Sequence, residues 1–153
     1  MKGKLFIACI ALLLMSCGDS SAPKTAGTEK ATTDGSSSYD PNRGEGKFSK
    51  VEVTPSLDVA KATSGEKVYG VKCGSCHKLS NEKLVGPGWQ GVTSRHTAEW
   101  IMNFATNPDP MITKDPKAQA MLEICLVRMP NQNVSDDDAR NVYEFMRKND
   151  GVK

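Results

Sequence analysis

Hydrophobic and polar positions divide the chain into three stretches. Lys2 and Lys4 precede an apolar run, Leu5 to Met15, which is shorter than the roughly 20 residues that span a bilayer. From residue 18 to about residue 55 the sequence is rich in Ser, Thr, Gly and Lys and has few apolar side chains. Such a stretch buries too little surface to offset the entropy of ordering, so it predicts a disordered tether. Residues 56–153 form the third stretch, which has the size of one small domain.

Helical patterns dominate this third stretch. Each predicted helix begins at a residue whose side chain can cap free backbone N–H groups, and apolar residues then recur at intervals of three and four. No segment alternates as a half-buried strand would. We therefore predict an all-α domain of about four helices. Their N-caps are Ser64, Thr97, Asp115 and Ser135; the first helix runs to about residue 73, the second ends before Pro108 and the third reaches about Val127.

The segment Cys73-Gly74-Ser75-Cys76-His77 carries the candidate chemistry. C-x-x-C-H is the attachment signature of a c-type haem. Two thiols on one side of a helical turn can form thioethers to the haem, and the next residue aims an imidazole at the iron. A zinc site would need a second pair of ligands, and a thioredoxin-like dithiol would follow a strand. The sequence offers neither, so it predicts one covalently bound haem c with His77 as an iron ligand.

Met129 is the main candidate for the sixth iron ligand. It lies between two predicted helices and precedes Pro130, which keeps the preceding residue extended. Met111, also in a predicted loop, and His96, the only other histidine, remain alternatives. The other methionines fall on helical apolar faces and are interpreted as core residues: Met102, Met121 and Met146.

The amino terminus predicts export from the cytoplasm. The apolar run ends in Leu14-Met15-Ser16-Cys17, which resembles the bacterial lipobox. We expect residues 1–16 to be a signal peptide, Cys17 to carry lipid, and residues 17–55 to tether the domain to a membrane. The domain would then face the periplasm, on the inner or the outer membrane. An ordinary signal peptide, which would leave a soluble periplasmic protein, is the alternative.

Charge narrows the choice of partners. The chain has 20 basic and 18 acidic residues, and removal of Lys2 and Lys4 with the signal leaves 18 of each. We therefore expect no nucleic-acid partner, since such proteins carry a basic excess. Cys125, on a predicted helix, is interpreted as a small buried hydrophobe. Four lysines near the haem motif form either a docking surface for an acidic protein or an ordinary solvated face: Lys67, Lys72, Lys78 and Lys83.

With its C-x-x-C-H motif and Met129-Pro130, the segment from about residue 58 to residue 149 resembles the class I cytochrome c family. Gly86-Pro87 after the motif adds to this resemblance. It implies that the carbonyl of Pro87 accepts the ring N–H of His77 and orients the imidazole.

The same resemblance gives roles to residues outside the motif. Gly65 and Tyr69, with Tyr143, look like the family's contact between the first and last helices. Three further residues resemble family positions whose N–H groups reach the haem propionates: Trp89, Arg95 and Trp100.

The resemblance implies an electron carrier rather than an enzyme, because both axial positions of the iron are filled. We expect a monomer that passes electrons from a quinol-oxidising complex to a terminal oxidase or periplasmic reductase. The alternative is a haem enzyme or gas sensor with an open or displaceable sixth position, in which His96 would be the candidate acid-base group.

Overall fold

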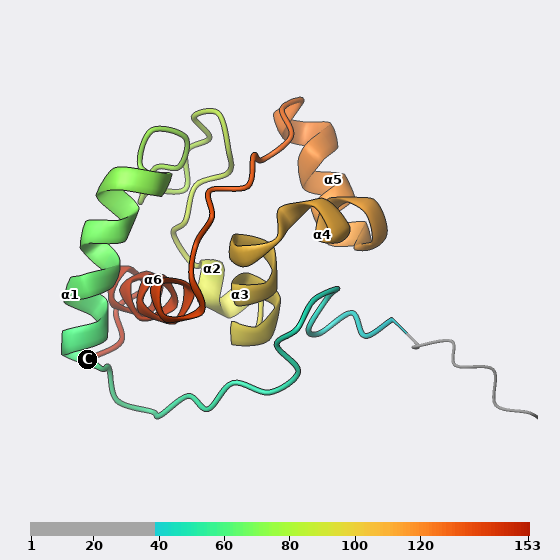
Figure 1. Cartoon of the computed structure of the whole chain (residues 1–153). Helices are drawn as coiled ribbons and strands as arrows, with labels where there is room; N and C mark the ends of the chain where they lie inside the picture. The colour runs from blue at the N-terminus through green and yellow to red at the C-terminus, as the bar shows by residue number, and fades with distance from the viewer. Residues whose placement is uncertain (1–38) are drawn as a thin grey trace, which may run out of the picture. The chain divides into compact units, whose positions relative to one another are not determined.

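The computed structural model describes residues 39–153, which contain six α-helices and no strand (Figure 1). The predicted all-α fold is confirmed. The predicted signal peptide, Cys17 and the tether up to residue 38 lie outside the described residues. Within residues 39–153, no helix is long and apolar enough to cross a bilayer. The helices are α1 (Val59–Val68), α2 (Val92–Arg95), α3 (Ala98–Thr106), α4 (Pro108–Lys114), α5 (Pro116–Cys125) and α6 (Asp136–Asn149).

Three of the four predicted N-caps are confirmed. The side chains of Thr97, Asp115 and Ser135 accept hydrogen bonds from the backbone N–H groups three residues later, at 3.2, 2.8 and 3.1 Å. Each bond satisfies a donor that the first helical turn leaves free. Helix α5 ends slightly earlier than predicted, at Cys125, because Leu126 adopts a left-handed conformation with φ 59°.

The predicted start of the first helix at Ser64 is wrong. Helix α1 begins at Val59, and its N-cap is Asp58, which accepts a hydrogen bond from Lys61 N at 3.0 Å. The helix continues through Ser64 because the turn on each side is packed, with Ala62 and Gly65 both buried. The short helices α2 and α4 were not predicted either, and α4 places Met111 on a helix rather than in a loop.

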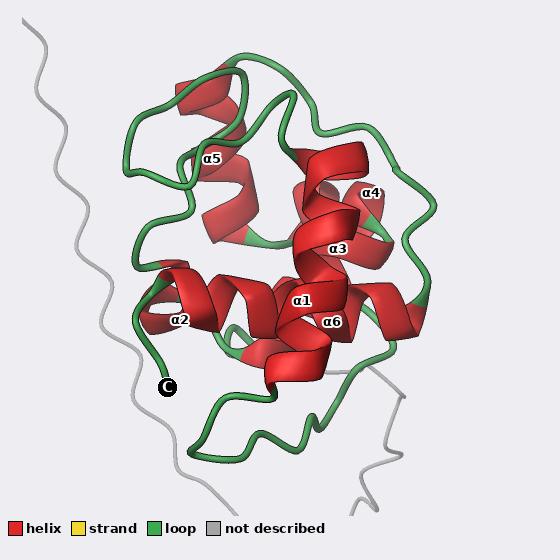
Figure 2. Ribbon diagram, turned by 90° about the vertical axis from the view of Figure 1, so that its left-hand side faces the viewer, coloured by secondary structure: helices red, strands yellow, loops and turns green. Residues whose placement is uncertain are grey.

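Helices α1 and α6 cross at close range (Figures 1 and 2). A Cβ atom at Gly65 would overlap the carbonyl oxygen of Asn141 and lie 2.9 Å from the Cβ of Phe145. Only glycine therefore allows this approach of the two backbones. The ring of Tyr69 packs on Phe145 of α6 at 5.4 Å and on Trp89 at 5.0 Å. A π-helical turn, Tyr69–Cys73, continues α1 and delivers the haem motif.

Residues 39–57, called the strap here, run along the helical domain instead of forming a tether to residue 55 (Figure 1). The N–H of Phe48 donates to Asn103 Oδ1 at 2.9 Å, and Asn103 Nδ2 donates back to the Phe48 carbonyl at 3.0 Å. The N–H of Val51 donates to Glu99 at 2.7 Å. The composition of the strap did not predict this docking, because the contacts are made by its backbone. Polar side chains of α3 form hydrogen bonds with that backbone.

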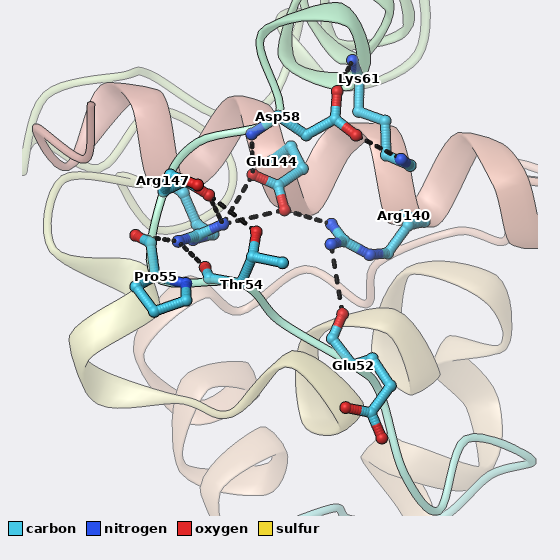
Figure 3. Close-up of polar contacts among 9 residues, drawn as sticks. Glu52, Thr54, Pro55, Asp58, Lys61, Arg140, Glu144 and Arg147 are labelled. Atoms are coloured by element: carbon cyan, nitrogen blue, oxygen red, sulfur yellow. Dashed lines mark hydrogen bonds and ion pairs between the residues drawn. The ribbon is translucent and has the colours of Figure 1, made fainter.

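A buried ion cluster attaches the strap to α6 (Figure 3). Glu144 is fully buried and lies 2.8 Å from Arg147 Nη1 and 2.6 Å from Arg140 Nη1. Arg147 Nη2 also donates to the carbonyls of Thr54 and Pro55, at 2.7 and 3.1 Å. The strap is thus joined to the helix that crosses α1.

Candidate haem-binding site

A cavity of about 720 Å³ opens beside the C-x-x-C-H motif. This volume lies within the range of about 300–1,000 Å³ that is common for cofactor sites. The π-helical turn and the loop after it form one wall, and α3, α5 and the loop 126–134 form another. Apolar side chains from several helices make up much of the lining, including Trp100, Ile101, Met121, Leu122, Val142 and Met146. The cavity therefore suits a large apolar cofactor.

The haem motif folds as one compact turn at the cavity wall. The N–H groups of Cys76 and His77 both donate to the carbonyl of Cys73 at 3.0 Å, and all three side chains line the cavity. Burial raises the pKa of the Cys73 thiol to about 11, so the unmodified thiol is neutral at pH 7. No three His, Cys, Asp or Glu side chains of residues 39–153 cluster as metal ligands. The turn therefore fits thioether attachment and not a zinc site.

His77 is held in one tautomer. Its Nδ1 lies 2.9 Å from the carbonyl oxygen of Pro87, and a carbonyl can only accept, so Nδ1 carries the proton. Nε2 is then the nitrogen available to a metal, and the bond gives the ring its orientation. Burial lowers the pKa of His77, which favours the neutral imidazole that metals bind.

Three neighbours fix the position of the His77 residue. The hydroxyl of Tyr69 donates to the His77 carbonyl at 2.7 Å, and the Trp89 ring lies 5.5 Å from the imidazole. A Cβ atom at Gly86 would overlap Cε1 of His77 and lie 2.7 Å from Nδ1. The ring therefore fills space that only a glycine leaves open.

Met129 lines the same cavity as His77, from the loop between α5 and α6. Met111 does not line it: this side chain is fully buried in α4, and its sulfur accepts a hydrogen bond from Glu45 N at 3.0 Å. Met102 is buried outside the lining. Met121 and Met146, which were predicted as core residues, also line the cavity. They lie on helices α5 and α6, whereas Met129 lies in a loop.

A second part of the wall carries nitrogen donors. Arg95, His96 and Lys117 all line the cavity, and Nδ1 of His96 is buried without a hydrogen-bond partner. Burial, followed by the charges of Lys117 and Arg95, lowers the pKa of His96 to about 4, so its ring is neutral at pH 7. An unpaired ring nitrogen and two cations on the same cavity wall suit the carboxylates of a haem. Sequence reasoning missed Lys117, whose charge alone gave no signal of this position.

Trp100 does not take the predicted role at the propionates. Its ring lines the cavity and stacks on His96 at 3.9 Å, but its Nε1 donates to Asp115 Oδ2 at 2.9 Å. Asp115 is fully buried, caps α5 and also accepts a hydrogen bond from the Tyr39 hydroxyl. The indole N–H is therefore already used within the protein. Arg95 keeps its place on the wall, with Nη1 donating to the Gln90 carbonyl at 2.6 Å.

Comparison with known proteins agrees with this arrangement. A family model described as Cytochrome c matches residues 62–150. The solved structure of a cytochrome c from Rhodothermus marinus is 30% identical, with a TM-score of 0.66 over 69% of this chain and 90% of that one. An engineered form of that protein, bound to a carbene intermediate, is also 30% identical, with a TM-score of 0.63 over the same shares of the two chains.

A curated protein gives a shorter match. The cytochrome c-type cyt cy of Rhodobacter capsulatus is 40% identical over 48 residues, which are 31% of this chain and 24% of that protein. The aligned part thus spans about a quarter of that relative.

The family model covers more than half of the chain, and the solved relatives share its helical fold. Membership implies a covalently bound haem c and an electron-transfer role. The chain belongs to the cytochrome c family.

Proposed function

We propose that this protein carries single electrons through a haem c joined to Cys73 and Cys76, with His77 and Met129 as the two iron ligands. The observation that carries the proposal is the shared cavity: His77, with Nδ1 bonded to the Pro87 carbonyl, faces the same cavity as the loop residue Met129. When bound, the haem iron supplies one-electron chemistry, and a thioether ligand favours its ferrous state.

The chain's own residues prepare the site for this role. Apolar side chains of α3, α5 and α6 exclude water, and a low dielectric disfavours the additional charge of the oxidised state. Arg95 and Lys117 on the cavity wall would oppose the negative charge of the cofactor's carboxylates, and the neutral ring of His96 would offer a hydrogen bond beside them. With both His77 and Met129 holding the iron, no coordination position would remain for a substrate.

Exchange of Met129 tests the ligand set. In the ferric holoprotein, Met129→Leu is expected to abolish the sulfur-to-iron charge-transfer band and to lower the reduction potential by on the order of 0.1 V or more, because axial ligands set this potential. Met121→Leu is the matched control, since Met121 lines the same cavity from a helix. Loss of the band in Met121→Leu, with retention in Met129→Leu, would contradict the assignment.

We further propose that lipid on Cys17 holds the protein at a membrane of the bacterial cell envelope, facing the periplasm. Because the strap from residue 39 packs on the helical domain, the connection between Cys17 and the domain is shorter than the 17–55 tether expected from composition. The roughly 21 residues between Cys17 and residue 39 span at most about 75 Å. Suitable partners are a quinol-oxidising complex and a terminal oxidase or periplasmic reductase within this reach.

Cell fractionation tests the anchor. Cys17→Ser is expected to move the haem protein from the membrane fraction to the soluble periplasmic fraction, because the substitution removes the lipid-accepting thiol. A variant that stays with the membrane to the same extent as the wild type would contradict lipid anchoring.

A second candidate is a haem protein that binds a small ligand at a displaceable sixth position. The engineered relative bound to a carbene intermediate motivates it, as does the unpartnered Nδ1 of His96 in the cavity wall. Rapid binding of carbon monoxide to the reduced wild-type protein, with high-spin iron at rest, would favour this function. Slow or absent binding would favour the electron carrier.

A further inference from the structure

Two lysines connect the His77 wall of the cavity to the Met129 loop. Lys72 lies in the π-helical turn, and its Nζ donates to the carbonyls of Gln132 and Asn133 at 3.1 and 3.0 Å. Lys83 lies in the loop after the haem motif, and its Nζ donates to the Ile124 carbonyl at 3.2 Å. Each contact joins segments more than 40 residues apart in the chain.

These contacts bracket Met129. Ile124 precedes it in α5, while Gln132 and Asn133 follow it in the loop. Residues 69–90 and residues 124–134 are joined by these three hydrogen bonds and by no others within the described part of the chain. The position of the loop relative to His77 therefore depends on them and on packing against the cavity.

Lys72 is the stronger of the two connections. Its side chain is partly buried, lines the cavity and binds two carbonyls, whereas Lys83 is exposed and binds one. Hydrogen bonds from a charged donor are stronger than those between neutral groups. The sequence left open whether these lysines form a docking surface or an ordinary solvated face. In the structure, the ammonium groups of Lys72 and Lys83 are engaged within the protein.

We propose that Lys72, supported by Lys83, is a positioning residue that keeps the Met129 loop closed against the His77 wall and so stabilises the bond between Met129 and iron. The proposal rests on the proposed ligation by Met129. Lys72 acts through the loop backbone and touches neither the sulfur nor the metal.

Imidazole binding to the ferric holoprotein tests this role. Imidazole forms a bond to iron only when the bond from the Met129 sulfur breaks, and loss of the charge-transfer band records the exchange. Lys72→Met keeps most of the side-chain length but removes the ammonium. We expect about tenfold faster and tighter imidazole binding, which corresponds to one lost charge-assisted hydrogen bond. Lys83→Met is expected to change binding by about threefold or less.

Lys67→Met is the matched control, because it removes the same charge from an exposed lysine of α1 that has no hydrogen bond or ion pair within the described residues. Lys72→Arg should restore slow binding, since a guanidinium also donates to carbonyls. Equal imidazole binding in Lys72→Met and Lys67→Met would overturn the proposal. If Lys72→Met yields no holoprotein, Lys72→Gln, which also removes the ammonium, takes its place, and imidazole binding in Lys72→Gln equal to that in Lys67→Met would overturn the proposal. A wild-type protein without the charge-transfer band would instead refute the ligation by Met129.

Discussion

The two walls that face each other across the haem cavity are built differently. On the His77 wall, separate hydrogen bonds fix the imidazole and the backbone: Nδ1 to Pro87, and the His77 carbonyl to Tyr69. Gly86 leaves room only for the ring. The Met129 loop is largely exposed, and it contains Leu126 and Asn133, the two non-glycine residues with positive φ among residues 39–153.

This difference indicates which of the two proposed iron ligands, His77 or Met129, is easier to replace. Unfavourable backbone conformations persist only where surrounding contacts impose them. The His77 position satisfies its contacts without such strain, whereas the Met129 loop begins with Leu126, a strained left-handed residue, and also contains Asn133 in the left-handed region that asparagine tolerates. We infer that loosening the protein releases Met129 long before His77.

The largest effect is expected from Gly86→Ala. The added methyl group would occupy the space of the His77 ring and force the imidazole away from its bond with Pro87. We expect little holoprotein, or ferric protein that lacks normal histidine ligation, because a second-shell contact and the ligand position are lost together. Absorption spectra and the yield of covalently bound haem measure the result.

Gly70→Ala is the control for this exchange. Gly70 lies in the π-helical turn close to the haem motif, yet a Cβ atom there would meet no atom within 4 Å. This variant should retain wild-type spectra and yield. Equal behaviour of the two alanine variants would contradict the view that space behind His77 is restricted.

A smaller effect is expected from Glu144→Gln, which leaves Arg140 and Arg147 without their shared carboxylate. Removal of one partner from a buried ion pair costs about 3–5 kcal/mol. Denaturant unfolding of the holoprotein measures this loss of stability, while the charge-transfer band should persist because Glu144, Arg140 and Arg147 do not line the cavity. Glu66→Gln, at an exposed pair with Lys148, should cost less than about 1 kcal/mol. Similar losses of unfolding free energy in Glu144→Gln and Glu66→Gln would show that burial does not determine the contribution of these ion pairs to stability.

The contrast between local contacts, as on the His77 wall, and long-range contacts also separates what the sequence could and could not predict. Local chemistry defines the caps at Thr97, Asp115 and Ser135 and the turn from Cys73 to His77, so these features were recognisable from neighbouring residues. The start of α1 was missed because Ser64 is a good cap by itself, and only packing against α6 carries the helix through it.

Long-range polar contacts were beyond the reach of sequence patterns. The strap is held by Asn103, Glu99 and Arg147, which lie far from it in the chain. Trp100 was assigned to the haem by its resemblance to a family position, and nothing in the sequence showed that the helix cap Asp115 would bind its indole N–H. In each case the side chain contacts a segment outside its own helix. The sequence pattern predicts only contacts within the helix.

The smallest effect, of opposite sign, is expected from Leu126→Gly. A left-handed conformation costs a non-glycine residue about 1–2 kcal/mol, while the greater freedom of glycine in the unfolded chain returns about 0.5–1 kcal/mol. Leu126 is 83% exposed, so little burial is lost. The holoprotein should therefore gain about 0.5–1 kcal/mol against denaturant. Leu126→Ala removes the side chain but keeps the strain, and should gain nothing. An alanine variant as stable as the glycine variant would mean that the Met129 loop is no more strained than the His77 wall.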